Sequence, residues 1–235
     1  YFTRSEGYRP GGWNRNAGVT PACRAYETTN PNYCGGTPGD GTYRADIVLA
    51  YSSDNVLNNE IGLKTLLMDG KMRFKATYYS IEWTDIQVSQ FDPVHVNFIT
   101  FIENAADADI RGLEADMLYY PTDTLTISAA LSLNDTKIVK DVAQTIPIVD
   151  IGNALPLAPQ TQGNVRIRKD LSLNNGYVQV AVKYASSTYN SFEAAKVLPQ
   201  PSYSMIDLAY GLTINDVDVE FFIRNAGDER ANLYY

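Results

Sequence analysis

Short and long connections alternate regularly between the segments of this chain that are predicted to form β-strands. The predicted strands comprise residues 1–8, 56–67, 71–87, 97–120 (with a break near Asn104), 125–135, 160–171, 176–189, 203–214 and 217–224. Short turns lie at 68–70, 121–124, 172–175 and 215–216, and long loops lie at 9–55, 88–96, 136–159 and 190–202. Up-and-down outer-membrane barrels place tight turns at one end and long loops at the other. The sequence therefore predicts an all-β fold, an antiparallel up-and-down transmembrane β-barrel.

Side chains within the predicted strands alternate between an uncharged set and a charged, mixed-sign set. The uncharged set includes Met72, Phe74, Ala76 and Tyr78; Leu113, Ala115, Met117 and Tyr119; Leu125, Ile127, Ala129, Leu131 and Leu133; Val178, Val180, Val182 and Tyr184; Ile206, Leu208, Tyr210 and Leu212; and Val217, Val219, Phe221 and Ile223. The intervening set includes Arg73, Lys75, Glu114, Asp116, Lys183, Asp207, Asp218, Glu220 and Arg224. An unpaired buried charge costs several kcal/mol or more, so the charged set must meet water. We therefore expect one face of the sheet to contact hydrocarbon and the other to line a hydrated lumen.

Composition agrees with this expectation and excludes other classes. The formal net charge is −8 over 235 residues, which argues against nucleic acid as a partner because phosphate binding needs clustered Lys and Arg. The 17 tyrosines suit half-wet surfaces and membrane interfaces better than a dry core. No apolar run approaches the ~20 residues that a transmembrane helix needs, and no segment keeps a helical apolar period.

The number of predicted strands bears on how much of a barrel the chain forms. Nine is an odd number, whereas bacterial single-chain barrels use even numbers and cannot leave unpaired strand edges in lipid. The chain also opens at Tyr1 without an initiator Met. We therefore expect residues 1–235 to be a single partial β-barrel domain, an incomplete wall cut from a longer protein.

Five stretches resemble one family in the order and spacing of that family. They are GYRPGG (7–12), NNEIGLKTLLMDGKMRFKATYYSIEWTDIQV (58–88), ADIRGLEADMLYYPTDTLTISAALSLNDTK (108–137), LPLAPQTQGNV (155–165) and FIRNAGDERA (222–231). Together they resemble the C-terminal part of the barrel of a TonB-dependent outer-membrane receptor. The sequence departs from the family where Ala226-Gly227 replaces the usual Leu-Phe after Asn225, and the final strand, the earlier strands, the plug and the TonB box are not found in it. The resemblance implies strands thirteen to twenty-one of a barrel of about 22 strands.

The resemblance also implies a function and a location. It implies a receptor in the bacterial outer membrane that binds a scarce nutrient complex outside the cell, most often a ferric siderophore. The complex would enter when the inner-membrane TonB complex pulls on the missing plug. The expected partners are therefore the nutrient complex, the TonB complex and outer-membrane lipid, with no cofactor, no metal site and no catalysed reaction. No motif in the chain identifies the substrate.

Candidate ligand-binding residues come from loops near the expected lumen mouth. Arg9 and Arg15 could donate charge-assisted hydrogen bonds to an anionic iron chelate, and Trp13 could offer a stacking face. The alternative for Trp13 is packing inside its own loop. His95 could contact the ligand, although an exposed loop residue is the simpler interpretation.

Two cysteines lie in a segment rich in Gly, Pro and Asn. Cys23 and Cys34 are predicted to form a disulfide that pins a long loop in an oxidising compartment, and the alternative is two unrelated thiols. The single His in the chain argues against a zinc site. Glu114 and Asp116 lie two apart on one strand face, where we expect them to act as lumen ion-pairing partners rather than as an acid–base pair.

Three alternatives to an energised receptor remain at this point. A passive porin would show a constricting internal loop in place of a plug. An outer-membrane hydrolase would need a Ser/His pair on adjacent strands facing lipid, whereas the only His lies in a predicted loop. A soluble β-rich adhesin would be recovered without detergent.

Overall fold

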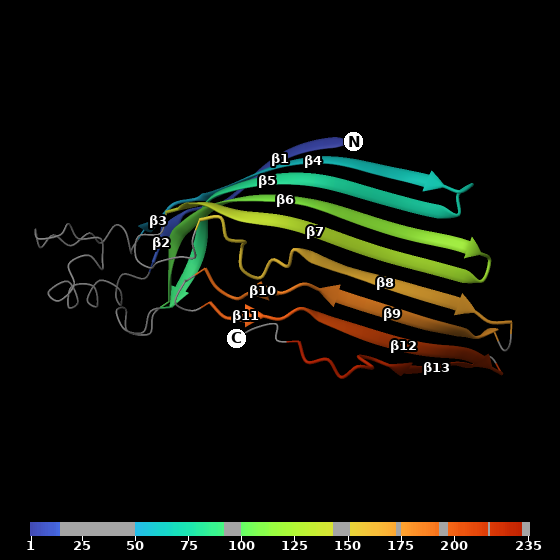
Figure 1. Ribbon diagram of the computed structural model, residues 1–235. Coiled ribbons are helices and arrows are strands. Elements are labelled where there is room, and N and C mark those ends of the chain that lie inside the picture. The colour runs from blue at the N-terminus through green and yellow to red at the C-terminus, as the bar shows by residue number, and fades with distance from the viewer. Residues whose placement is uncertain are drawn as a thin grey trace, which may run out of the picture.

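Nine strands form one antiparallel sheet in the computed structural model of this chain (Figure 1). The structure describes residues 1–14, 50–91, 100–142, 151–172, 175–192, 197–215 and 217–231. The sheet contains, in spatial order, β1 (Phe2–Arg9), β4 (Asp54–Leu67), β5 (Met72–Phe91), β6 (Thr100–Thr122), β7 (Leu125–Asp141), β8 (Thr161–Asp170), β9 (Tyr177–Ala185), β12 (Tyr203–Ile214) and β13 (Val217–Ile223). Each strand pairs with the next large strand along the chain, so the predicted up-and-down order and the predicted number of strands are confirmed.

Two short strand pairs lie outside the main sheet. They are β2 (Gly12–Trp13) with β3 (Ala50–Tyr51), and β10 (Thr188–Tyr189) with β11 (Pro199–Gln200). Both pairs lie at the end of the sheet opposite the short turns (Figure 1). The strands β2, β3 and β11 therefore form local structure within predicted loops, whereas β10 lies within the strand predicted for residues 176–189.

The predicted strand bounds differ from the structure most at β5, β7 and β9. The strand β5 extends to Phe91 rather than to residue 87. The strand β7 extends to Asp141 rather than to residue 135, because residues beyond a bulge continue to pair with β6. The strand β9 ends at Ala185 rather than at residue 189, and the chain forms β10 after a two-residue interruption. The break expected near Asn104 is instead a pair of register shifts between β5 and β6 within continuous strands.

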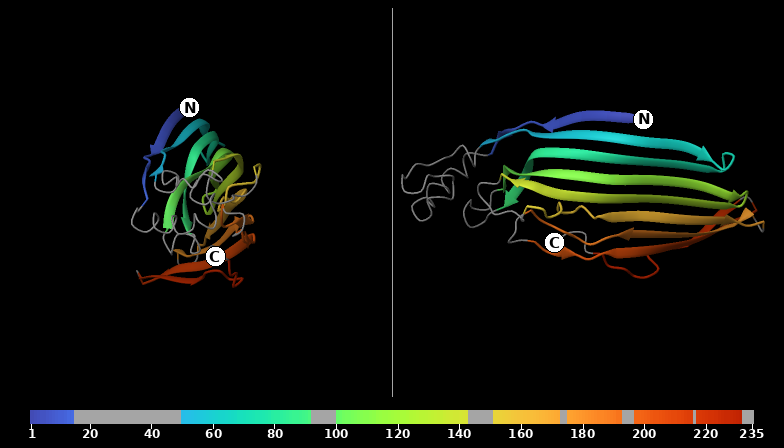
Figure 2. Two further views of the ribbon diagram at one scale, coloured as in Figure 1. Left: turned by 90° about the vertical axis from the view of Figure 1, so that its left-hand side faces the viewer. Right: turned by 45° about the horizontal axis from the view of Figure 1, so that its top comes forward.

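The sheet is curved across its strands. Viewed along the strands, it forms an arc rather than a flat layer (Figure 2, left). Such curvature and the up-and-down order match part of the wall of a transmembrane barrel. Among the described residues, no helix is long and apolar enough to cross a membrane.

The register places the predicted uncharged set on one face, which we call the lipid face. Tyr78, Leu113 and Leu133 form one continuous cross-strand row on this face. Its side chains stay exposed within the chain, for example Ile61 at 60 % and Val180 at 43 %. A soluble monomer rarely exposes so large an apolar surface. The face is therefore suited to hydrocarbon, as the alternation of side chains predicted.

The lipid face has a sharp boundary on its loop side. From Leu125 to Leu133, β7 covers about 26 Å of strand, or about 20 Å of depth at a tilt of about 40°, close to the apolar band of about 25 Å in such barrels. Directly beyond it lie two rows of charged residues. They contain Arg111 opposite Asp135 and Asp109 opposite Lys137. This change marks the outer edge of the membrane-spanning part.

A small buried core lies beyond that edge, toward the loop end. Its buried members are Ile86, Ala105, Ala106, Ala108, Ile138 and Leu155. The segment that follows β7 covers this core, because the Leu155 amide donates to the Thr136 hydroxyl (2.9 Å) and the Ile138 amide donates to the Asn153 carbonyl (2.9 Å). Packing of apolar side chains thus stabilises the strand ends beyond the lipid face.

Candidate functional site

The face opposite the lipid face, which we call the lumen face, carries an ion pair at its loop end. The carboxylate of Asp54, at the start of β4, is only 1 % exposed. It accepts hydrogen bonds from the Arg9 amide (3.0 Å), the Arg9 Nε (2.7 Å) and the Trp83 indole Nε1 (3.1 Å), and it also contacts Arg9 Nη2. The Arg9 guanidinium lies 5.6 Å from the centre of the Trp83 ring. This Arg9–Asp54 pair joins the loop ends of β1, β4 and β5.

Electrostatics hold the Asp54 carboxyl ionised. Burial raises its pKa, but the hydrogen bonds from Arg9 and Trp83 and the Arg9 charge together outweigh burial, so the pKa lies below the ordinary value of 3.8. The pair lies beyond the charged rows that border the lipid face, so it is outside the membrane-spanning part. A buried carboxylate with several donors to it is a fixed structural element of the lumen mouth.

Hydrogen bonds from side-chain amides hold the two segments that flank residues 15–49 against β5 and β6. Gln87 Nε2 donates to the Pro10 carbonyl (3.1 Å) and to the Ser52 carbonyl (2.9 Å). Asn104 Oδ1 accepts from the Ser52 amide (2.7 Å), and Asn14 exchanges two hydrogen bonds with the backbone of Ile102 (2.7 and 2.8 Å). Sequence reasoning missed these residues, because isolated amides in long strands carry no pattern that distinguishes them.

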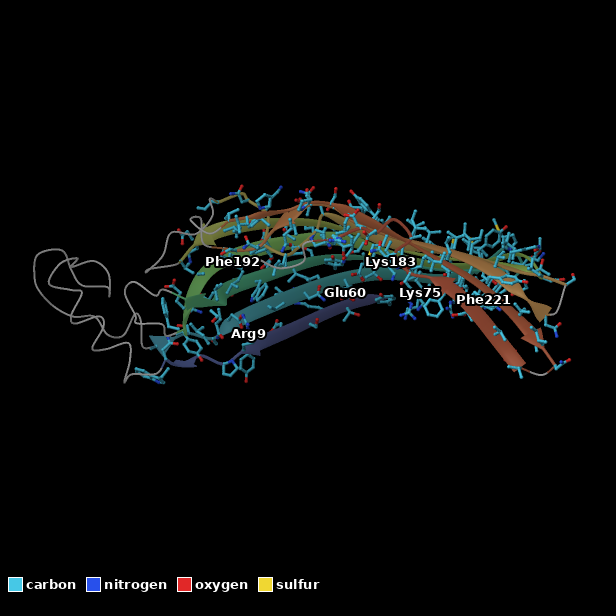
Figure 3. The ribbon with its side chains drawn as sticks, turned by 90° about the horizontal axis from the view of Figure 1, so that it is seen from below. Arg9, Glu60, Lys75, Lys183, Phe192 and Phe221 are labelled. Carbon is cyan, nitrogen blue, oxygen red and sulfur yellow. The ribbon has the colours of Figure 1, made fainter. Side chains whose placement is uncertain are left out.

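The structure brings two of the predicted ligand-binding residues to the loop end. Arg9 lies there, where Figure 3 labels it, and its guanidinium is engaged by Asp54. Trp13 lies in β2 and is 77 % exposed. Arg15, His95, Cys23 and Cys34 lie outside the described residues, so their predicted roles and the predicted disulfide stay predictions.

The turn half of the lumen face contains a groove of about 590 Å³. Its charged lining residues are Arg73 and Lys75 from β5, Asp116 from β6, and Arg166 and Arg168 from β8. In register, Leu118 of β6 and Ser128 of β7 lie between Arg73 and Arg166. We call this hollow the lumen groove. Figure 3 shows Lys75 in the half of the sheet near the short turns, away from Arg9.

The ion pairs expected of Glu114 and Asp116 do not form within the part of the chain that the structure describes. Glu114 and Asp116 share the lumen face as predicted, yet neither forms an ion pair with another residue of the described chain; Asp116 pairs in register with Lys75. An ion pair does form between Lys183 and Asp207 (3.3 Å), which joins β9 to β12. Among the described residues, no cluster of three or more His, Cys, Asp or Glu could hold a metal ion.

Comparisons with known proteins agree with this geometry. The family model described as TonB dependent receptor-like, beta-barrel matches residues 1–226. No curated protein matches the chain. Similar solved structures include the ferric yersiniabactin uptake receptor FyuA from Yersinia pestis, with 16 % identity, a TM-score of 0.68, and coverage of 99 % of this chain and 30 % of that one. Another is the siderophore receptor PiuA from Acinetobacter baumannii, with 18 % identity, a TM-score of 0.67, and coverage of 99 % and 30 %.

A third is the ferric-catecholate import receptor Fiu from E. coli K12, with 13 % identity, a TM-score of 0.64, and coverage of 99 % and 29 %. The chain thus spans about 30 % of the length of the receptors that it resembles. Members of the matched family are transport receptors of the Gram-negative outer membrane. The resemblance found in the sequence is confirmed, and the chain belongs to the TonB-dependent receptor β-barrel family.

Proposed function

We propose that the polypeptide containing this chain is an outer-membrane receptor that takes up a ferric siderophore complex with energy from the TonB complex. The observation that carries this proposal is one sheet with a lipid face and a charged lumen face, which matches siderophore receptors over 99 % of the chain. In this proposal residues 1–235 form one part of the barrel wall. That wall supplies a scaffold, a hydrated lumen face and loops that contact the nutrient complex.

The loop end supplies the candidate contacts with the nutrient complex. The exposed indole of Trp13 supports a stacking role for that residue. The Arg9 guanidinium forms an ion pair with Asp54, so we propose that Arg9 mainly stabilises the structure of the lumen mouth rather than binding the nutrient complex. Arg15 and His95 remain proposed contacts on sequence grounds.

Radiolabelled iron uptake tests this function directly. The natural polypeptide that contains this sequence would be expressed in cells that lack other iron receptors, with and without an intact TonB complex. We expect uptake of a ferric siderophore only when the TonB complex is intact. Uptake that continues without the TonB complex would favour the passive porin, and an absence of uptake for a broad panel of ferric complexes would contradict the proposal.

A further inference from the structure

Three glycines on the lumen face of the main sheet are each covered by a tyrosine of the neighbouring strand. The pairs are Tyr1 with Gly62, Tyr79 with Gly112 and Tyr177 with Gly211. In each pair the two residues are direct cross-strand partners, and a Cβ on the glycine would collide with the tyrosine ring. Glycine is therefore the residue that leaves room for the ring at these positions.

The hydroxyl of each tyrosine reaches beyond the glycine to a third strand. Its hydrogen-bond partners are Thr77 Oγ1 for Tyr1 (2.9 Å), Asn134 Oδ1 for Tyr79, and Glu220 Oε2 for Tyr177. These three residues are also the cross-strand partners of Gly62, Gly112 and Gly211. Tyrosine, glycine and polar partner thus form one straight row across three strands, which we call a register row.

Cations hold two of the three rings in place. The Arg168 Cζ lies 3.6 Å from the centre of the Tyr177 ring, and the Lys64 Nζ lies 5.3 Å from the centre of the Tyr1 ring. Arg168 is itself oriented by Asp170, whose Oδ1 accepts a hydrogen bond from the Arg168 Nε (2.9 Å). These contacts add to the hydroxyl hydrogen bonds in fixing the rings over the glycines.

The register rows occur where the connections of the chain do not fix the register. A tight turn sets the register of the two strands that it joins, whereas a long connection leaves it free. Each Tyr–Gly pair bridges strands joined by a long connection at the loop end, namely β1 with β4, β5 with β6, and β9 with β12 (Figure 1). Each glycine and its polar partner lie within a hairpin closed by a tight turn. A register row therefore anchors one strand to the hairpin that follows it.

The alternation of side chains leaves a register ambiguity of two residues. A slip of one residue would move every apolar side chain to the lumen, whereas a slip of two residues keeps both faces intact. A slip of two would place a residue with a Cβ beneath each tyrosine ring. The residues concerned are Glu60 and Lys64 on β4, Ile110 and Glu114 on β6, and Ala209 and Thr213 on β12.

The fourth long connection, between β7 and β8, is fixed by Asn134 instead. The Asn134 amide donates to the Gln160 carbonyl (2.8 Å), and its Nδ2 donates to the Pro159 carbonyl (3.2 Å). Asn134 also accepts the hydrogen bond from Tyr79. The register row that begins on β5 therefore extends through β7 to the segment that enters β8.

We propose that the three register rows select the strand register of the barrel wall, because the tyrosine rings admit only glycine beneath them. The rows supply this selection at the connections that are too long to supply it themselves. The inference concerns how the wall forms, so it does not depend on the transported substrate or on the TonB complex.

Disulfide trapping tests the row that joins β5 to β6. In the natural polypeptide that contains this sequence, with its native cysteines replaced by serine, Lys75→Cys/Asp116→Cys reports the observed register. Lys75→Cys/Glu114→Cys and Lys75→Cys/Leu118→Cys report slips of two residues in either direction. We expect Tyr79→Leu to raise the trapped fraction of slipped pairs at least about fivefold. Tyr79→Phe keeps the ring and loses the hydrogen bond to Asn134, so it should raise that fraction less.

The matched control is Tyr78→Leu, on the lipid face of the same strand, which should leave the fraction of slipped pairs unchanged. An unchanged fraction in Tyr79→Leu, or an equal rise in Tyr78→Leu, would overturn the proposal.

A second variant decides the case in which Tyr79→Leu does not assemble, as judged by heat-modifiable electrophoretic mobility. Phe91 and Thr100 are opposite each other in register, so an Asn-Gly turn in place of residues 92–99 would fix the register of β5 and β6 through the chain. We expect Tyr79→Leu to assemble in this background. Failure to assemble there would show that Tyr79 contributes only local packing, which contradicts the proposal.

Discussion

At the scale of single residues, the loop end depends on a buried carboxylate. Asp54 is satisfied by three donor groups from Arg9 and by the indole of Trp83, so it links β1, β4 and β5. Its partner Arg9 is half-exposed, which weakens the Coulombic part of the interaction. Hydrogen bonding to a buried acceptor is therefore the main contribution of this residue.

Removing the Asp54 carboxylate should loosen the mouth without unfolding the barrel. We expect Asp54→Ala to destabilise the loop ends of β1 and β4 by about 1–3 kcal/mol, the range for leaving buried hydrogen-bonding groups unpaired. Hydrogen exchange of the amides of residues 6–9 and 54–57 should accelerate, while the exposed-turn control Asp123→Ala leaves them unchanged. Unchanged protection in Asp54→Ala would show that the pair is dispensable.

The same carboxyl predicts a pH dependence. Because the pKa of Asp54 is lowered in the folded state, its stabilising contribution is complete above 3.8 and is lost as the pH falls through the lower folded-state value. In a Trp13→Phe background, the emission of Trp83 should therefore change only below about pH 4. A transition centred above the ordinary value of 3.8, or the same transition in Asp54→Asn, would contradict this assignment.

At the scale of elements, the strands beyond the membrane are shaped by bulges. The register between β5 and β6 shifts between Trp83 and Ile86, where Asp85 adopts a φ of 53° and its amide donates to Asp107 Oδ1 (2.7 Å). The sequence indicated strands at these positions but no bulge. Side chains still alternate between the two faces on each side of a bulge, so the alternation was enough to predict the strand. The register shift was not predictable in this way, because it depends on side-chain hydrogen bonds such as the one accepted by Asp107.

The bulge predicts an ordered series of substitutions at Asp85. Gly adopts positive φ at no steric cost, whereas Ala does not, so Asp85→Ala should lower the free energy of unfolding by about 1 kcal/mol relative to Asp85→Gly. Urea unfolding of the natural polypeptide in lipid vesicles would measure the difference. Equal midpoints for the two variants would indicate that the bulge relaxes around Ala.

Close contact between neighbouring strands constrains Gly112 of β6. A Cβ at this position would lie 2.8 Å from the Leu133 carbonyl and 2.3 Å from the Tyr79 ring. We expect Gly112→Ala to destabilise the sheet by about 1–3 kcal/mol, as overpacking does. The double variant with Tyr79→Leu should recover part of the loss in the same urea assay, because it removes the ring and leaves the backbone contact. Full recovery would show that the carbonyl contact is unimportant.

At the scale of the whole molecule, one prediction follows from the two faces. Spin labels at Leu131 and Val180 should be accessible to oxygen and protected from a water-soluble nickel chelate, because both residues lie on the lipid face. Labels at Asp135 and Lys137 should show the reverse. A label at Leu131 that is inaccessible to both reagents would mean that protein, not lipid, covers this face.

The sequence by itself determined the fold class, the number of strands in the sheet, the end at which each loop lies and the face on which the alternating residues of six strands lie. It could do so because a period of two residues and the lengths of connections are local properties of the chain. It could not determine which side chains meet. The pairing of Asp54 with Arg9, and the row of Arg73, Leu118, Ser128 and Arg166 across four strands, arise from register between segments far apart in sequence. That register, and the bulges that shift it, depend on hydrogen bonds and packing that exist only once the sheet has formed.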